Sequence, residues 1–163
     1  MRILGFFLVC FLTTPATAGC ERFFSSAEVK FGIPKGFLQA ISFTEVGLGI
    51  NGKLRELAIN VGGVQIYFRD KKTATRYLSL IKNKNVDVGC MQINYYWHGK
   101  NFNNITDMLN PRTNVMYAAK FLKEKFIKTG SWQNAIRQYH SNDSTKSSIY
   151  FKKFLDNYKK LIS

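Results

Sequence analysis

The feature that most constrains the fold is an apolar run, residues 34–45, that ends in a carboxylate. Four of its residues are spaced three and four apart and therefore share one face of an α-helix: Phe37, Leu38, Ile41 and Glu45. Pro34 suits the first turn of a helix, and Gly47 follows as a helix-stop signal. The pattern predicts a helix whose buried face ends in an acid.

The position of Glu45 favours a protonated carboxyl. Burial disfavours the charged form, and the negative end of the helix dipole repels it, so both effects raise the pKa. A carboxyl that keeps its proton near neutral pH can act as a general acid. The alternative interpretation is a helix-end glutamate that pairs with a basic neighbour.

The first 18 residues have the pattern of a secretory signal peptide. Arg2 gives a positive start, residues 3–12 are a short apolar run, and Ala16-Thr17-Ala18 is a cleavage site of the A-x-A type. The run is too short for a permanent membrane span. We expect cleavage after Ala18, a single mature domain at residues 19–163, and a location in the periplasm.

Removal of the signal peptide would leave two cysteines, Cys20 and Cys90. Two cysteines in an exported chain suggest one disulfide, and two free, partly buried thiols are the alternative. Lipid attachment at Cys20 is an alternative to simple export, because Ala18-Gly19-Cys20 is similar to the end of a lipoprotein signal. Thr17, however, stands where that signal usually has leucine.

The chain is strongly basic. It has 24 Lys and Arg against 10 Asp and Glu, and Arg2 is the only charged residue before position 19, so 23 basic residues remain after cleavage. This excess favours anionic partners. For an exported protein these are the carboxylates of cell-wall peptides and muramic acid, or anionic lipid surfaces. We expect no nucleic-acid partner, because the chain carries an export signal and no recognisable nucleic-acid-binding motif.

The remaining pattern predicts a mostly helical α+β domain. Helical periodicity extends over residues 20–31, 71–83, 110–126, 131–140 and the C-terminal segment, and one helical turn is expected at 53–58. Residues 60–68 alternate with a period of two after Gly62-Gly63, which predicts a small β element.

A second informative stretch runs from Asp87 to Gly99. Gln92 and Asn94 stand just before the aromatic cluster Tyr95-Tyr96-Trp97. Amides donate and accept hydrogen bonds with sugar hydroxyl and acetamido groups, and aromatic rings cover apolar sugar faces. The alternative is a buried strand followed by an aromatic turn.

Nearly the whole mature chain, about residues 20 to 160, resembles the catalytic domain of the soluble lytic transglycosylases, a lysozyme-like fold that cuts peptidoglycan. The resemblance rests on four segments: Ala40-Ile41-Ser42-Phe43-Thr44-Glu45-Val46-Gly47, Gly89-Cys90-Met91-Gln92-Ile93-Asn94, Asn110-Pro111-Arg112-Thr113-Asn114-Val115 and Tyr139-His140-Ser141. They are similar to the family's segment ending in Glu-Ser-Gly, its Gly-Leu-Met-Gln-Ile-Asn motif, its Asp-Pro-x-x-Asn-Ile helix opening and its Ala-Tyr-Asn, in that order.

The resemblance implies that Glu45 is catalytic. It would protonate the glycosidic oxygen between N-acetylmuramic acid and N-acetylglucosamine and then accept the proton of the muramyl C6 hydroxyl. The product would be a 1,6-anhydromuramyl end, formed without water. A scheme with two carboxylates would need a second acid, for which Asp87 and Glu56 are candidates. We expect Asp87 to be structural.

The resemblance also implies the residues around the acid. Tyr139 would hydrogen-bond or orient Glu45, Gln92 would contact the sugar with Met91 packed beneath it, and Asn94 would be a further contact. Thr44 is a further candidate for the site. Val46 stands where the family has serine, and the hydroxyl of Thr44 or Ser42 could compensate for the serine hydroxyl that is lost. We expect no cofactor, and two isolated histidines, His98 and His140, do not make a metal site.

Two other functions stay open on the same scaffold. One is a muramidase of the lysozyme type, which uses water, and the other is a non-catalytic wall-binding or secretion-assembly protein. The chain also resembles a subgroup of small exported enzymes of alphaproteobacterial type, some of them encoded beside envelope-spanning secretion machines. That likeness implies such an apparatus as a partner. We also expect the protein to bind peptidoglycan glycan strands and to be a monomer.

Overall fold

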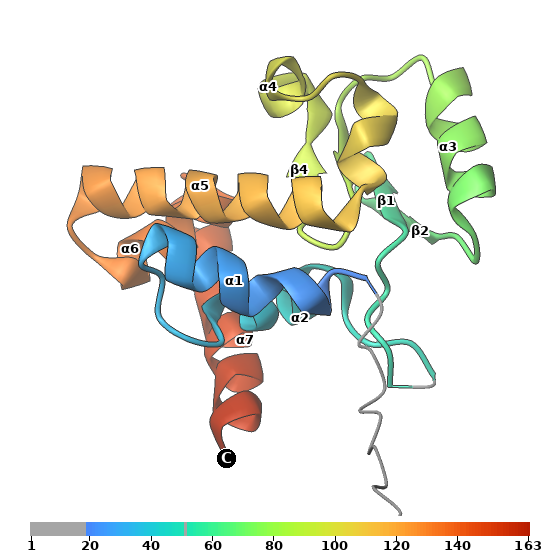
Figure 1. Cartoon of the computed structure of the whole chain (residues 1–163). Helices are drawn as coiled ribbons and strands as arrows, with labels where there is room; N and C mark the ends of the chain where they lie inside the picture. The colour runs from blue at the N-terminus through green and yellow to red at the C-terminus, as the bar shows by residue number, and fades with distance from the viewer. Residues whose placement is uncertain (1–18, 51) are drawn as a thin grey trace, which may run out of the picture.

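The computed structural model describes residues 19–50 and 52–163, so the predicted signal peptide lies outside the described residues. This part of the chain forms seven α-helices, two 3-10 helices and one four-stranded sheet (Figure 1). The elements are α1 (Glu21–Phe31), α2 (Phe37–Val46), β1 (Ala58–Val61), β2 (Val64–Tyr67), α3 (Lys71–Leu80), β3 (Val86–Val88), β4 (Ile93–Asn94), α4 (Tyr95–His98), η1 (Gly99–Asn101), η2 (Ile105–Leu109), α5 (Pro111–Thr129), α6 (Trp132–His140) and α7 (Ser144–Ile162). The predicted class, mostly helical α+β, is confirmed.

Helix α2 carries the predicted apolar face and packs against α7 and α1. Leu38 and Ile41 are fully buried, and both α1 and α6 pack against α5 (Figure 1). The ring of Phe37 makes edge contacts with three aromatic rings, those of Trp132, Phe154 and Tyr158. The predicted apolar face is therefore the face that holds α2 in the core.

The start of α2 differs from the prediction. Pro34 was expected in the first turn, but the helix begins at Phe37. The carboxylate of Glu28, on α1, accepts hydrogen bonds from the backbone N–H groups of Gly36 and Leu38 at 3.0 and 2.9 Å. An acid from a neighbouring helix thus supplies the cap that the local sequence lacks, and it fixes where α2 begins.

The sheet is antiparallel and has the strand order β2-β1-β3-β4. Gly62 and Gly63, both with positive φ, form the two-residue turn between β1 and β2. The predicted β element is therefore a hairpin, to which β3 and β4 add two short strands. The helical turn expected at 53–58 is wrong, because Leu54 instead forms an isolated bridge with Leu48.

The disulfide between Cys20 and Cys90 is formed, and it joins the start of α1 to the loop after β3. A lipid anchor on Cys20 would need the same sulfur atom. That alternative therefore conflicts with the structure. No helix within the described residues is long and apolar enough to span a bilayer.

Candidate active site

A pocket of about 260 Å³ lies where the C-terminal end of α2 meets the sheet, α4 and the end of α6. Four residues predicted from the sequence line it: Glu45, Gln92, Asn94 and Tyr139. Asp87, Asn60, Trp97 and His140 also line it, so acids, amides and rings from six elements meet in one place.

Glu45 is the only member of the pocket from α2, and its side chain is partly exposed there. Its Oε1 accepts a hydrogen bond of 2.8 Å from the hydroxyl of Tyr150, and no cation of the described residues forms an ion pair with it. Burial raises the pKa of Glu45 to about 8, the Tyr150 hydrogen bond lowers it in part, and the charge of Asp87 adds to the rise. The carboxyl therefore keeps its proton at neutral pH.

The hydrogen bond predicted from Tyr139 to Glu45 is made by Tyr150 instead. The hydroxyl of Tyr139 donates to the backbone carbonyl of Met91 at 2.8 Å, although its ring still lines the pocket. The Tyr150 ring is held by His140, which stacks on it with a centroid separation of 4.4 Å and an interplanar angle of 2°. The two tyrosines therefore hold different groups. Tyr150 hydrogen-bonds to the carboxyl of Glu45, and Tyr139 hydrogen-bonds to the loop that carries Met91 and Gln92.

Gln92 projects into the pocket from a strained backbone. It is the only described residue other than glycine with a positive φ, 47°. Its Nε2 donates to the backbone carbonyls of Gly89 and Ala58, at 2.8 and 3.2 Å. Both amide protons are engaged, so Oε1 is the atom that remains to accept a hydrogen bond from a ligand.

Asn94 and Asp87 form a hydrogen-bonded pair on the sheet. The Nδ2 of Asn94 donates to Asp87 at 2.8 Å and to Asn85 at 2.9 Å, and its Oδ1 accepts from the backbone N–H of Trp97. Burial raises the pKa of Asp87, and the hydrogen bond from Asn94 lowers it in part. The side chain of Asn94 is therefore used to hold Asp87 and to cap α4, while Asp87 faces the pocket.

Asn114, fully buried in α5, holds the loop that carries Gln92. It accepts a hydrogen bond from the backbone N–H of Met91 at 2.9 Å and donates to the carbonyl of Val88 at 3.0 Å. Gly89 has a φ of 81°, and a Cβ there would lie 2.7 Å from the Asn114 amide. The loop can approach α5 this closely only with glycine at position 89.

A family model described as the Transglycosylase SLT domain matches residues 71–158, which is more than half of the chain. The chain belongs to this family. Searches of curated proteins and of solved structures give no match. The segment of the chain that matches the SLT domain contains Gln92, Asn114 and Tyr150. It begins after α2, which carries Glu45.

Two other residues that were predicted from the sequence, Thr44 and Glu56, lie outside the pocket. The hydroxyl of Thr44 donates to the carbonyl of Ala40 at 2.7 Å and accepts from Asn157 at 3.0 Å, so it joins α2 to α7. Glu56, the other candidate for a second acid, accepts a hydrogen bond from the backbone N–H of Cys20. Of the two candidates, only Asp87 shares the pocket with Glu45.

Met91, which was expected to pack beneath Gln92, is fully buried. The described residues contain no group of three His, Cys, Asp or Glu side chains that could hold a metal ion. The polar groups described at the site include the carboxyls of Glu45 and Asp87, the phenols of Tyr139 and Tyr150, and the amide oxygen of Gln92.

The sequence interpretation missed Tyr150 and Asn114 as residues that shape the site, and it named Ser42 only as a hydroxyl that could compensate for Val46. Ser42, fully buried, donates to the carbonyl of Cys90 at 2.9 Å and so joins α2 to the loop. Asn114 could have been found, because it is the asparagine of the helix-opening motif in the SLT resemblance. Tyr150 had no such signal, since it is one of several aromatic residues on the apolar stripe of α7.

Proposed function

We propose that the protein is a peptidoglycan lytic transglycosylase. It would cleave the β-1,4 bond between N-acetylmuramic acid and N-acetylglucosamine and leave a 1,6-anhydromuramyl end. Membership of the SLT family supports the reaction class. The proposal for this chain rests on one observation, which is the protonated carboxyl of Glu45 in a pocket of amides and aromatic rings.

In the first step, Glu45 acts as the general acid. Its proton moves to the glycosidic oxygen, the bond from that oxygen to the muramyl C1 breaks, and the N-acetylglucosamine part leaves as a neutral alcohol. Glu45 is then a carboxylate. The hydrogen bond from Tyr150 stabilises this charged form and holds Oε1 in place.

In the second step, the same carboxylate acts as the general base. It takes the proton of the C6 hydroxyl while O6 forms a bond to C1, which closes the anhydro ring and restores the protonated acid. No proton is gained or lost over the two steps. A pKa near 8 suits both roles, because the group must release and recover one proton at neutral pH.

The other pocket residues would hold the sugar. The free Oε1 of Gln92 would accept from a sugar N–H or hydroxyl, and the exposed ring of Trp97 would cover an apolar sugar face. Asp87, held by Asn94, would stabilise positive charge that develops at C1. Sugar binding by Asn94 and Tyr139 stays a prediction, since their polar atoms are already paired.

Product analysis tests the proposal. Purified peptidoglycan is digested with the wild type and with Glu45→Gln, and the soluble products are weighed by mass spectrometry. We expect anhydro ends, lighter than reducing ends by one water, with the wild type and none with the variant. Full activity of Glu45→Gln would refute the role of this acid.

A muramidase of the lysozyme type is the second candidate, and the placement of Asp87 favours it. A second carboxylate in the same pocket could activate water or stabilise the cation. Reducing ends in the same digest would identify this reaction. A slower reaction in Asp87→Asn whose products still carry anhydro ends would instead give Asp87 a supporting role in the first reaction.

We also propose that the mature domain, residues 19–163, acts in the periplasm. The disulfide supports an oxidising compartment, because such bonds persist outside the cytoplasm. An N-terminal sequence that begins at Gly19 in protein purified from the periplasm would support this, and an intact residue 1 would contradict it. A partner among envelope-spanning secretion machines remains part of this proposal.

A further inference from the structure

A row of polar side chains crosses the whole sheet from the pocket to its far edge. Asn94, Asp87, Asn60 and Gln65 are directly opposite one another on β4, β3, β1 and β2. Residues opposite each other in an antiparallel sheet point to the same face. Three of the four line the pocket, and Gln65 extends the row beyond it onto the edge strand.

The edge strand β2 is joined to α2 just after the catalytic acid. The Nε2 of Gln65 donates to the backbone carbonyl of Glu45 at 3.2 Å, and the hydroxyl of Tyr67 donates to the carbonyl of Val46 at 3.4 Å. Tyr67 follows Gln65 by two residues, so both side chains lie on the same face of the strand. The polar face of the sheet therefore continues past Glu45 to Tyr67.

Arg55 lies on the ring of Tyr67 at this edge. Its Cζ is 4.4 Å from the ring centroid, and one guanidinium nitrogen lies 4.0 Å from where a Cβ on Gly47 would stand. Stacking on an aromatic face leaves the edge of the guanidinium open to a carboxylate. Within the described residues, no carboxylate forms an ion pair with Arg55.

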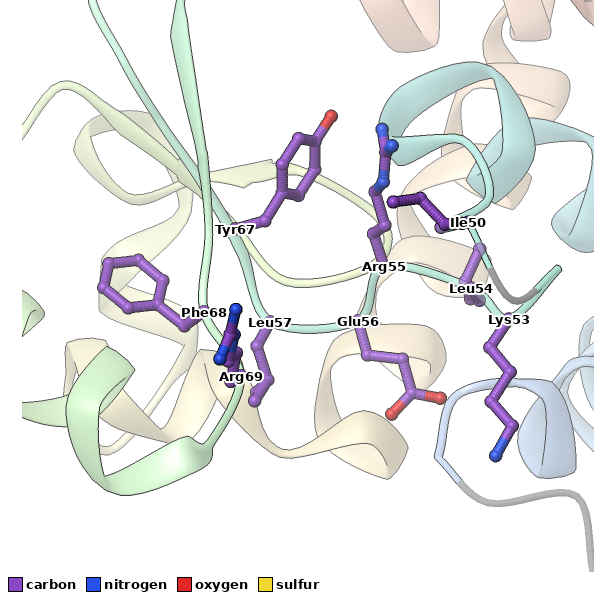
Figure 2. Close-up of a pocket in the computed structure, with 10 residues that line it drawn as sticks. Ile50, Lys53, Leu54, Arg55, Glu56, Leu57, Tyr67, Phe68 and Arg69 are labelled. Carbon is purple, nitrogen blue, oxygen red and sulfur yellow. The ribbon is translucent and has the colours of Figure 1, made fainter.

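Figure 2 shows the directions in which the side chains around Arg55 project. Arg55 and Tyr67 project to one side of the loop and strand, and Glu56 and Lys53 project to the other. All four line a second pocket, of about 720 Å³. The Arg55–Tyr67 pair thus places a cation on the side of the loop and strand opposite to Glu56 and Lys53.

We propose that the Arg55–Tyr67 pair binds a carboxylate carried by the glycan strand, outside the pocket in which Glu45 acts. This inference rests on the proposed function. The strand is a polymer, so sugars on either side of the cleaved bond must extend beyond a pocket of about 260 Å³. Its hydroxyl and acetamido groups are neutral, and its carboxylates belong to the attached peptides or to muramyl lactyl groups that have lost their peptide.

Binding of three soluble ligands tests the inference: strands with peptides, strands stripped of peptides by an amidase, and N-acetylglucosamine oligomers without carboxylates. Affinities are measured by calorimetry in a Glu45→Gln background, so that no strand is cut. Arg55→Gln is compared with Arg69→Gln, which removes the same charge from another residue of the second pocket. Thermal unfolding checks that both variants fold.

We expect Arg55→Gln to weaken binding of a carboxylate-bearing strand about fivefold at low salt, and Arg69→Gln to leave it unchanged. The difference should shrink at high salt. A loss confined to peptide-bearing strands assigns the carboxylate to the peptide, and a loss confined to stripped strands assigns it to the lactyl group. A loss on both means that the pair binds either carboxylate. An equal loss on the neutral oligomers, or no loss on any ligand, would overturn the inference.

The wild type is assayed for strand cleavage in parallel. Absence of new strand ends would refute the proposed function. The binding measurements do not depend on turnover. A failure of the proposed function can therefore be distinguished from a failure of the inferred carboxylate site.

Discussion

Replacing Glu45 by glutamine tests the acid through stability, without any assay of activity. Glutamine has nearly the same shape as the protonated glutamic acid, and its carbonyl oxygen can still accept the hydrogen bond from Tyr150. The substitution therefore removes the ability to ionise and keeps the packing. Any pH-dependent difference between the two proteins then reports on the ionisation of Glu45.

The size of the effect follows from the pKa. Burial raises the pKa of Glu45 from 4.5 to about 8, and each unit corresponds to about 1.4 kcal/mol, so ionising the folded protein costs at most about 5 kcal/mol. Between these two pH values the folded protein holds a proton that the unfolded chain has released. The stability of the wild type therefore falls as pH rises through this window, and Glu45→Gln escapes that loss.

Urea unfolding of both proteins from pH 4 to pH 9 measures the difference. We expect similar free energies of unfolding at pH 4 and a variant that is more stable by several kcal/mol at pH 9. Glu124→Gln is the matched control, because Glu124 is exposed on α5 and forms an ion pair with Lys120 at 3.8 Å on the surface of the same helix. Its curve should run parallel to the wild type. A parallel curve for Glu45→Gln would mean that Glu45 has an ordinary pKa and would refute the reasoning.

Three further predictions concern the support of the site. Tyr150→Phe removes a hydrogen bond that lowers the pKa of Glu45, so the alkaline limb of the pH–rate profile should move to higher pH and the rate fall about tenfold; an unchanged profile would contradict this. Reducing the Cys20–Cys90 bond, which closes a separation of 70 residues, should lower the unfolding free energy by about 4 kcal/mol in urea, and an unchanged midpoint would be the contrary result. Asn114→Ala should cost about 2 to 4 kcal/mol, because the N–H of Met91 and the carbonyl of Val88 lose their partner, whereas a loss under 1 kcal/mol would show that water replaces it.

The helices and part of the site could be predicted because their signals are local. Spacing along residues 34–45 placed Glu45 at the end of a buried helix face, and the amides near Gln92 stood beside aromatic residues. The start of α2 could not be predicted in this way, since the cap comes from Glu28 on another helix. A helix boundary that depends on a tertiary contact leaves no trace in its own residues.

The sheet and the partner of the acid depend on contacts that are distant in sequence. The alternation after Gly63 predicted one β element, but the two or three residues of β3 and β4 are too few to show a period. Tyr150 is 105 residues from Glu45, and its hydroxyl is distinguished from those of other tyrosines only by the packing of α7 on α2. The sequence could therefore predict an acid and nearby tyrosines, whereas the hydrogen bond between Tyr150 and Glu45 could be found only from the fold.

Three glutamates have raised pKa values, and they differ in the donors that hold the carboxyl. Glu28 accepts from the backbone N–H groups of Gly36 and Leu38, and Glu56 accepts from that of Cys20. Backbone amides are fixed donors that stabilise the carboxylate, so these two acids have stable structural partners. Glu45 accepts from a phenol and faces a second carboxylate, and burial outweighs the one stabilising bond. Glu45, with its pKa raised to about 8, lines the pocket that also holds Asp87, Gln92 and Tyr139.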